Sequence, residues 1–200
     1  MLGLPSTTEV NRRFPKEAFY SHLKVGKRSR GEFVEGIDRI MLANTVKPGT
    51  ANVANGRRVH EIMVFLVELK SPGIPERALA VIDSANPSPK VFLCRYGGES
   101  TTILFRRGIR KFEGEPGMSL SAGSLDEIWD DYVSERIFGE KTEGDLDARI
   151  VREEKVAEMR SEIEQLDQKC RKCKQINKRN ALFAELKARQ AELARFEKGE

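Results

Sequence analysis

Residues 59–69 constrain the fold more than any other segment, because the apolar run at 62–67 is unbroken. A strand that is apolar on both faces must be covered on both faces, as the central strand of a helix-packed sheet is. The sequence therefore predicts a central strand here. A second strand is predicted at Ile37–Val46 and is joined to the central one by a loop at 47–56.

The segments that follow have the pattern of a strand, a helix and a hairpin. A turn containing Pro and Gly at 71–75 precedes apolar residues at helical spacing up to Ile82, which predicts one helix. Residues 90–96 and 101–106 are rich in strand-forming side chains, and the four residues between them predict a hairpin loop. We therefore expect a βαββ unit, whose crossover is right-handed if its first two strands are parallel.

Capping patterns predict helices near the start of the chain. Ser6 and Glu9 have the spacing of a capping box, so a short helix is expected to begin at Ser6. Pro15 suits the first turn of a second helix, which is expected to run through Leu23. Residues 26–31 are expected to form a loop.

A second capping box predicts a helix after the sheet. Ser124 and Glu127 repeat the spacing, and they follow a linker that is rich in Gly and Pro at 112–123. The helix that they begin is expected to pack on the sheet. Residues 139–144 contain two glycines and mark the expected boundary with a separate C-terminal element.

Apolar residues near the C-terminus recur at alternating steps of three and four, as in a coiled-coil seam. They are Val156, Met159, Ile163, Leu166, Cys170 and Cys173. The phase is lost at 175–180, where Asn177 and Asn180 are poor helix-interior residues and good N-caps. This slip favours an antiparallel helical hairpin with its tip at 175–180, and one long helix with a stutter is the alternative.

The predicted fold class is α+β. A small mixed β-sheet packed by helices is expected at 1–139, followed by an antiparallel, coiled-coil-like helical hairpin at 145–200. No apolar stretch is long enough to span a membrane, and the first five residues lack the pattern of a secretory signal. The sequence thus predicts a cytoplasmic protein that makes no contact with membranes.

The net charge of +4 conceals a strong separation of charge along the chain. Residues 167–181 carry six cations and one acid, whereas residues 113–167 are strongly acidic. The cations are Lys169, Arg171, Lys172, Lys174, Lys178 and Arg179. A helical arm that presents them could neutralise several phosphates of DNA, and an acidic groove of a protein would fit them as well. No exposed aromatic residue is expected among these cations, so base stacking is not predicted. The simpler alternative to a binding site is that the cations belong to ordinary solvated helix faces.

Glu68 and Lys70 form a Glu-x-Lys pair at the end of the central strand, which is half of the motif of restriction-type nucleases. In such sites carboxylates hold Mg2+, which lowers the pKa of an attacking water, and the lysine offsets charge on the phosphate. A further acid is required, and Asp38 is the candidate. The alternative is a strand end held by a salt bridge, with no catalytic residue and no cofactor.

Cys170 and Cys173 have the spacing of a redox pair or of half a zinc site. Both fall on the predicted seam, so buried small apolar side chains are the favoured interpretation. Cys94 is far away in sequence, and no metal site is expected from the three cysteines.

The two ends of the chain resemble an uncharacterised bacterial family whose members are about as long as this chain. The resemblance rests on residues 2–17 and 163–186, with further similarity at 61–70 and at Ile82 and Asp83. Genes of that family tend to lie beside type III restriction helicases and DNA methyltransferases. The resemblance therefore implies an accessory role in bacterial restriction or anti-phage defence, and it implies no known activity and no catalytic residues. Members carry Phe where this chain has Ile176.

Taken together, these features favour a non-enzymatic accessory module. Its basic arm is expected to bind the DNA backbone or a helicase or methyltransferase partner. The rival hypothesis is a Mg2+-dependent nuclease that uses Asp38, Glu68 and Lys70, and a toxin-neutralising or regulatory partner is a third.

Overall fold

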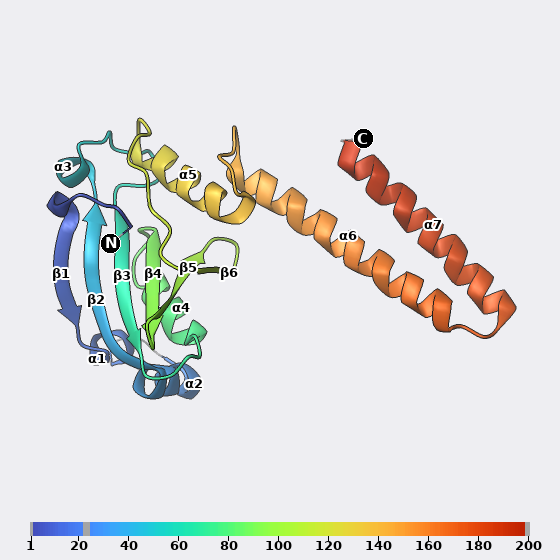
Figure 1. Ribbon diagram of the computed structural model, residues 1–200, viewed down its shortest axis with the longest axis horizontal. Coiled ribbons are helices and arrows are strands. Elements are labelled where there is room, and N and C mark those ends of the chain that lie inside the picture. Colours follow the sequence, from blue (N-terminus) through green and yellow to red (C-terminus); the bar gives the residue numbers. More distant parts are fainter. Residues whose placement is uncertain (1, 22–24, 199–200) are drawn as a thin grey trace. The chain divides into compact units, whose positions relative to one another are not determined.

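Six strands form one mixed sheet in the computed structural model, which describes residues 2–21 and 25–198 (Figure 1). The strands lie in the sheet in the order in which they occur along the chain. Neighbouring strands are antiparallel except for β3 and β4, which are parallel. Their bounds are β1 Glu9–Phe14, β2 Ile37–Val46, β3 Ile62–Leu69, β4 Lys90–Tyr96, β5 Glu99–Phe105 and β6 Ile109–Glu113.

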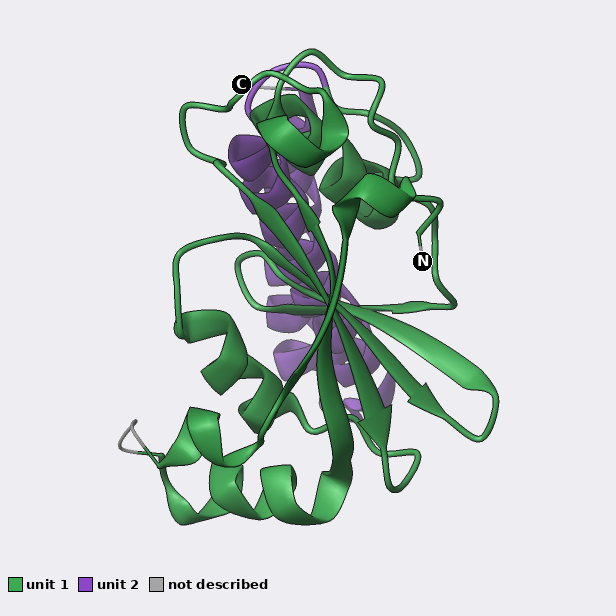
Figure 2. Ribbon diagram, turned by 90° about the vertical axis from the view of Figure 1, so that its left-hand side faces the viewer, with its two compact units in different colours: residues 1–142 green, residues 143–200 purple. Residues whose placement is uncertain are grey.

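The chain divides into two compact units, residues 1–142 and 143–200 (Figure 2). The first unit contains the sheet, and the second is a pair of packed helices, so the predicted α+β class with a C-terminal helical hairpin is confirmed. None of the described helices is apolar enough over a sufficient length to cross a bilayer. The helices are α1 Glu17–Tyr20, α2 Lys27–Gly31, α3 Pro48–Ala51, α4 Glu76–Ser84, α5 Leu125–Phe138, α6 Leu146–Lys172 and α7 Ile176–Lys198.

Strand β3 lies in the interior of the sheet, as its unbroken apolar run predicts. Side chains on both of its faces are buried, Val64 on one and Val67 on the other. Helix α4 covers the face of Val67 with Leu79 and Ile82, which belong to the same hydrophobic cluster. Strand β3 begins at Ile62, three residues later than the predicted start at 59.

The predicted βαββ unit is confirmed as β3, α4, β4 and β5, with β3 and β4 parallel. Its hairpin loop is two residues long, however, and not four. Gly97 and Gly98 form the loop with φ angles of +57° and +88°, which residues with a side chain rarely adopt. Two glycines in sequence allow a tighter turn than the spacing of strand-forming residues indicates.

The edges of the sheet differ most from the sequence prediction. The helix expected from Ser6 is a three-residue 3-10 turn, Ser6–Thr8, and it leads directly into the edge strand β1. Residues 26–31, predicted as loop, contain α2, and the start of the predicted linker at 112 belongs to the other edge strand, β6. The expected second helix is only α1, and its predicted end at Leu23 lies outside the described residues.

Helix α5 begins at the predicted cap. The backbone N–H of Glu127 donates to Ser124 Oγ at 3.4 Å, and the Glu127 carboxylate accepts from the N–H of Gly123 at 2.8 Å. Asp126 in the first turn of α5 also fixes the loop before β3, because its carboxylate accepts the backbone N–H groups of residues 57, 58 and 59. Gly56 permits this close approach, since a Cβ there would lie 2.5 Å from Asp126 Oδ1.

We predict that Asp126→Asn lowers the free energy of unfolding by about 1–3 kcal/mol at pH 7, because an amide has a single acceptor oxygen and no charge for three donors. Burial alone would raise the pKa of Asp126, but the N–H groups of Val59, Arg57 and Arg58 together lower it. A lowered pKa in the folded state stabilises the protein above the ordinary carboxyl pKa, and this stability is lost as the pH falls through the folded-state value.

Urea denaturation at pH 7 and pH 3 measures this effect. The difference in free energy of unfolding between Asp126→Asn and the wild type should be smaller at pH 3 than at pH 7. Asp131→Asn is the matched control, because Asp131 has one exposed partner, Lys141, at 2.6 Å, and its loss should cost less than about 1 kcal/mol. Equal losses for both variants would contradict the special role of Asp126.

The C-terminal unit is the predicted antiparallel hairpin and not one long helix. Leu166 and Cys170 of α6 are buried against Leu186 of α7. Residues 173–175 connect the two helices, so the predicted position of the tip at 175–180 is too late in the sequence. The predicted capping role of Asn177 and Asn180 is wrong, because α7 already begins at Ile176. The carbonyl of Gln175 instead accepts the N–H of Arg179 at 2.9 Å, which begins the helical hydrogen-bond pattern.

Candidate functional site

The three residues of the nuclease hypothesis lie at one end of the sheet. Glu68 and Lys70 are at the end of β3, and Asp38 is near the start of β2. Because β2 and β3 are antiparallel, these two ends are neighbours. Arg39 pairs with Glu68 across the strands, and a bulge between Ile37 and Arg39 contains Asp38. The structure therefore brings Asp38 to the same end of the sheet as Glu68 and Lys70, which lie 30 and 32 positions later in the sequence.

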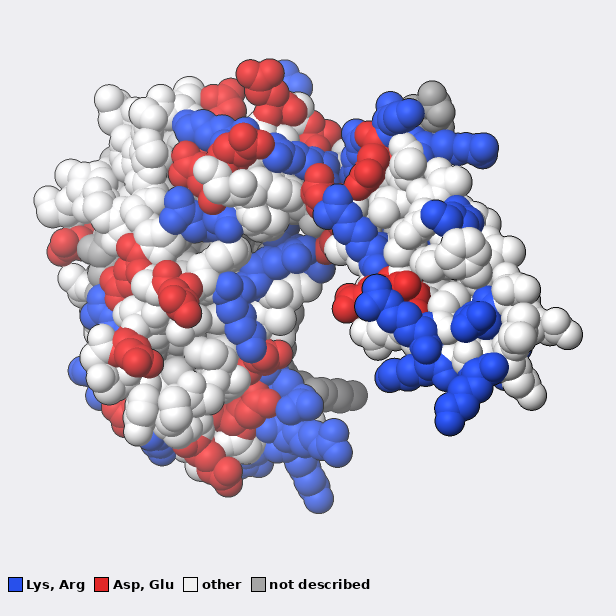
Figure 3. Space-filling model, turned by 45° about the vertical axis from the view of Figure 1, so that its right-hand side comes forward, with Lys and Arg blue, Asp and Glu red and all other residues white. Residues whose placement is uncertain are grey.

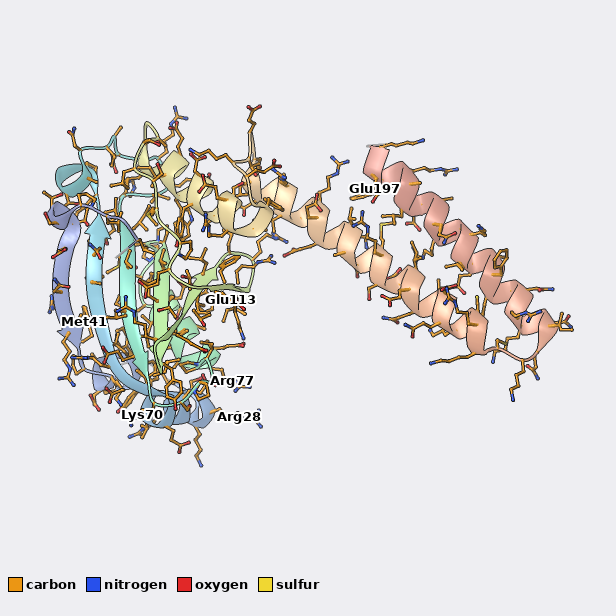
Figure 4. The ribbon with its side chains drawn as sticks, in the orientation of Figure 1. Arg28, Met41, Lys70, Arg77, Glu113 and Glu197 are labelled. Atoms are coloured by element: carbon orange, nitrogen blue, oxygen red, sulfur yellow. The ribbon has the colours of Figure 1, made fainter. Side chains whose placement is uncertain are left out.

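Asp38, Glu68 and Lys70 line a single pocket of about 740 Å³. The pocket lies at the carboxyl ends of the parallel strands β3 and β4, where open sheets commonly bind ligands. Figure 4 shows Lys70 at the same end of the sheet as Arg28 and Arg77. The remaining lining residues are Leu69, Arg95, Tyr96, Gly97, Gly98, Glu99, Ser100 and Glu115.

Most charges in this pocket already have partners. Arg39 donates from Nε and Nη2 to one oxygen of Glu68, at 3.0 and 2.6 Å, and Lys70 Nζ donates to the carbonyl of Val34 at 2.7 Å. Arg95 donates two hydrogen bonds to Glu115, at 2.5 and 2.8 Å. These bonds lower the pKa of the Glu115 carboxyl against the effect of burial. Two of the carboxylates that line the pocket, Glu68 and Glu115, are thus held in ion pairs.

One carboxylate of the hypothetical Mg2+ site is partly occupied in this arrangement. A Mg2+ site needs carboxylate oxygens that are free to coordinate, and one oxygen of Glu68 is held by Arg39. Within residues 2–21 and 25–198, no three Asp, Glu, His or Cys side chains are placed to hold a metal ion together. The geometry at Glu68 is that of a salt-bridged strand end.

The six basic residues at the end of the hairpin, between 169 and 179, are all exposed. We call the six side chains Lys169, Arg171, Lys172, Lys174, Lys178 and Arg179 the basic tip. Arg171 pairs with Asp167 at 2.7 Å, one helical turn away, with 78% of the Arg171 side chain exposed. The other five make no ion pair within the described part of the chain. Figure 3 shows Lys and Arg side chains gathered where the two helices connect.

The two cysteines of the hairpin are free thiols with different surroundings. Cys170 is buried in the seam, as predicted, whereas Cys173 is half-buried and its thiol lies 3.6 Å from the carbonyl of Gln175. Cys94 is buried in the sheet, and burial raises the pKa of its thiol to about 12.

An exposed aromatic side chain lies beside the basic tip, which the sequence did not predict. Phe183 is 52% exposed, and Lys187 Nζ lies 5.5 Å from the centre of its ring. Leu182 and Leu186 take the positions that face α6, so Phe183 between them is turned outward. The four-residue spacing of Leu182 and Leu186 was the sequence signal that could have predicted that Phe183 is exposed.

Comparisons with known proteins identify a family and assign no activity. No curated protein and no solved structure gave a significant match to the chain. One family model matches residues 2–111 and 108–193, which together cover nearly the whole chain. The chain therefore belongs to the family described as Domain of unknown function (DUF4391).

Proposed function

We propose that this protein is a non-enzymatic accessory module of a bacterial restriction or anti-phage defence system. Through the basic tip it binds the DNA backbone or a helicase or methyltransferase partner. Because such ligands are cytoplasmic in bacteria, we propose a cytoplasmic location. The observation that carries the proposal is the group of six exposed cations at the end of α6, in the connection and at the start of α7, five of them without an ion pair in the described chain. The resemblance to a family encoded beside restriction helicases and methyltransferases supports the setting.

The packing of the two helices fixes the positions of these cations, which favours binding. The helices meet through Leu166, Cys170 and Leu186, so the tip is held in place before a ligand arrives. Each phosphate that a cation neutralises releases a counterion, and a compact group of about four to six cations makes binding depend steeply on salt. Contacts to phosphates do not read base sequence, so the binding is independent of sequence.

A salt titration tests this function. Fluorescence anisotropy with a labelled duplex of about 30 base pairs should give a log K that falls with log salt with a slope of about −4 to −5. A duplex of scrambled sequence should bind with the same affinity at each salt concentration. A slope near zero, or no binding at about 20 mM salt, would exclude the DNA backbone as a ligand of the basic tip.

A nuclease is the second candidate function, and one observation favours it. The pocket at the end of the sheet contains Asp38, Glu68 and Lys70, three residues that the chemistry of such a site requires. For this function Mg2+ would have to bind the second oxygen of Glu68 or the Arg39 side chain would have to leave, because Arg39 holds one of the two carboxylate oxygens.

Incubation of the pure protein with plasmid and Mg2+ separates the two functions. The accessory function predicts that the plasmid stays intact. The nuclease function predicts cleavage that Glu68→Ala abolishes and that Glu61→Ala retains, because Glu61 lies before the opposite end of β3 and pairs with Lys47. Cleavage that both variants retain at the level of the wild type would point to a contaminating enzyme and would support neither function.

A further inference from the structure

Two large apolar side chains are exposed on α7 beside the basic tip. Ile176 is 66% exposed and Phe183 is 52% exposed, and the other exposed large apolar residues of the described chain reach at most 46%. The two are seven residues apart, which is two turns of helix, so they lie on the same side of α7. Together they form a small apolar surface, which we call the Ile176–Phe183 face.

This face is separate from the seam that holds the hairpin together. Leu186 is buried against α6 and Leu182 packs on the same cluster, while neither Ile176 nor Phe183 belongs to it. The stability of the hairpin therefore does not explain why these two side chains are apolar. Exposed apolar residues that are grouped on one side of a helix are typical of a surface that binds a partner.

Cations surround the Ile176–Phe183 face. Arg179 lies between the two residues in sequence, and Lys187 sits over the Phe183 ring. Lys172 and Lys174 are exposed in the neighbouring turn. A complementary ligand thus has apolar side chains for the centre of the surface and carboxylates for its rim.

This chemistry selects one class of partner. Ile176 offers no ring for a base to stack on, and the bases of duplex DNA are already stacked on one another and are not open to the Phe183 ring. Duplex DNA therefore uses the cations and not the apolar pair. A second copy docked tip to tip would bring like charges together, which disfavours self-association. A helix with an apolar stripe flanked by Glu or Asp satisfies both parts of the surface, as helix-in-groove partners do.

We propose that the Ile176–Phe183 face, with the cations around it, is the docking site for an acidic amphipathic helix of a protein partner. The proposal rests on the proposed function in that it names the class of partner for the same tip. The apolar pair gives the interaction its affinity, and the cations give it orientation and a fast encounter.

A synthetic helical peptide of about 28 residues is the probe, with Leu at two positions in each heptad and Glu at the flanking positions. Two further peptides carry Ser in place of Leu and Lys in place of Glu. By fluorescence anisotropy at nanomolar peptide, below its self-association, the wild-type protein should bind the Leu/Glu peptide at least tenfold more tightly than either of the others.

The protein variants separate the apolar contribution from the charges. Ile176→Ser with Phe183→Ser should weaken binding of the Leu/Glu peptide at least tenfold and change DNA affinity less than twofold, because no charge changes. Val151→Ser is the matched control, since Val151 is exposed on α6 and should leave both affinities unchanged. Unchanged circular dichroism of the double variant confirms its fold.

Several results would overturn the docking site while leaving the proposed function intact. They are equal binding of the Leu and Ser peptides, unaltered peptide binding by the double variant, or a dimer in gel filtration that the double variant dissociates. A loss of DNA affinity in the double variant equal to its loss of peptide affinity would assign the pair to nucleic acid instead. Absence of salt-dependent DNA binding by the wild type would instead remove DNA from the proposed function, and it would leave the docking site for a protein helix unaffected.

Discussion

Reversal of four charges at the basic tip should lower the affinity for duplex DNA at least 100-fold at about 20 mM salt. The substitutions are Lys172→Glu, Lys174→Glu, Lys178→Glu and Arg179→Glu. Each removes an exposed cation and adds an anion next to the ligand, so phosphate contacts are replaced by repulsion at the same positions. Anisotropy measures the effect, and co-purification with the native partner should fall in parallel.

A control with the same change of net charge shows whether position matters. Arg13, Lys27, Arg28 and Arg57 are exposed and lie in the first unit. Their replacement by Glu should reduce DNA affinity less than tenfold, because only the long-range field of the protein changes. Equal losses in the two sets of variants would mean that overall charge, and not the tip, determines binding.

Leu186→Asp should unfold the hairpin seam and lower its stability by about 3–5 kcal/mol. Leu186 is 5% exposed and packs on Leu166 and Cys170, so the substitution both removes apolar contacts and buries a carboxylate without a partner. Hydrogen exchange should show loss of protection in α6 and α7. DNA affinity should also fall, because the cations of the tip are then no longer held in one arrangement.

Ala184→Asp is the matched control for this effect. Ala184 is an exposed residue of the same helix, so an added carboxylate there remains in water. It should change stability by less than about 0.5 kcal/mol. If both variants keep full protection of α6 and α7, the seam does not hold the hairpin together.

The interior elements could be predicted from sequence because their side chains carry the pattern themselves. Strand β2 has the predicted bounds Ile37–Val46, and α5 begins after Ser124 as its cap indicates. The edge strand β1 was missed because five of its six residues are exposed and no amphipathic alternation marks it. It is a strand because it pairs with β2, which is information that its own sequence does not contain.

The candidate sites likewise include features that local sequence predicts and features that it does not. The cations of the tip follow from composition and from the slip in the seam, both of which are local patterns. That Asp38 shares a pocket with Glu68 depends on antiparallel pairing and on a bulge, and the ion pair that occupies Glu68 depends on the register of Arg39. The exposure of Phe183 depends on which of two adjacent apolar residues faces α6. Local sequence patterns do not determine these tertiary choices.

Lysine acetylation of the DNA-bound protein, followed by mass spectrometry, tests most directly where a polyanion binds. At low salt, duplex DNA should protect Lys169, Lys172, Lys174 and Lys178 of the basic tip. It should leave two lysines at the end of the sheet reactive, namely Lys16, which donates to the carbonyl of Ile37, and Lys70, which lines the pocket. Protection of Lys16 and Lys70 with a fully reactive tip would contradict the proposal and transfer the function to the end of the sheet.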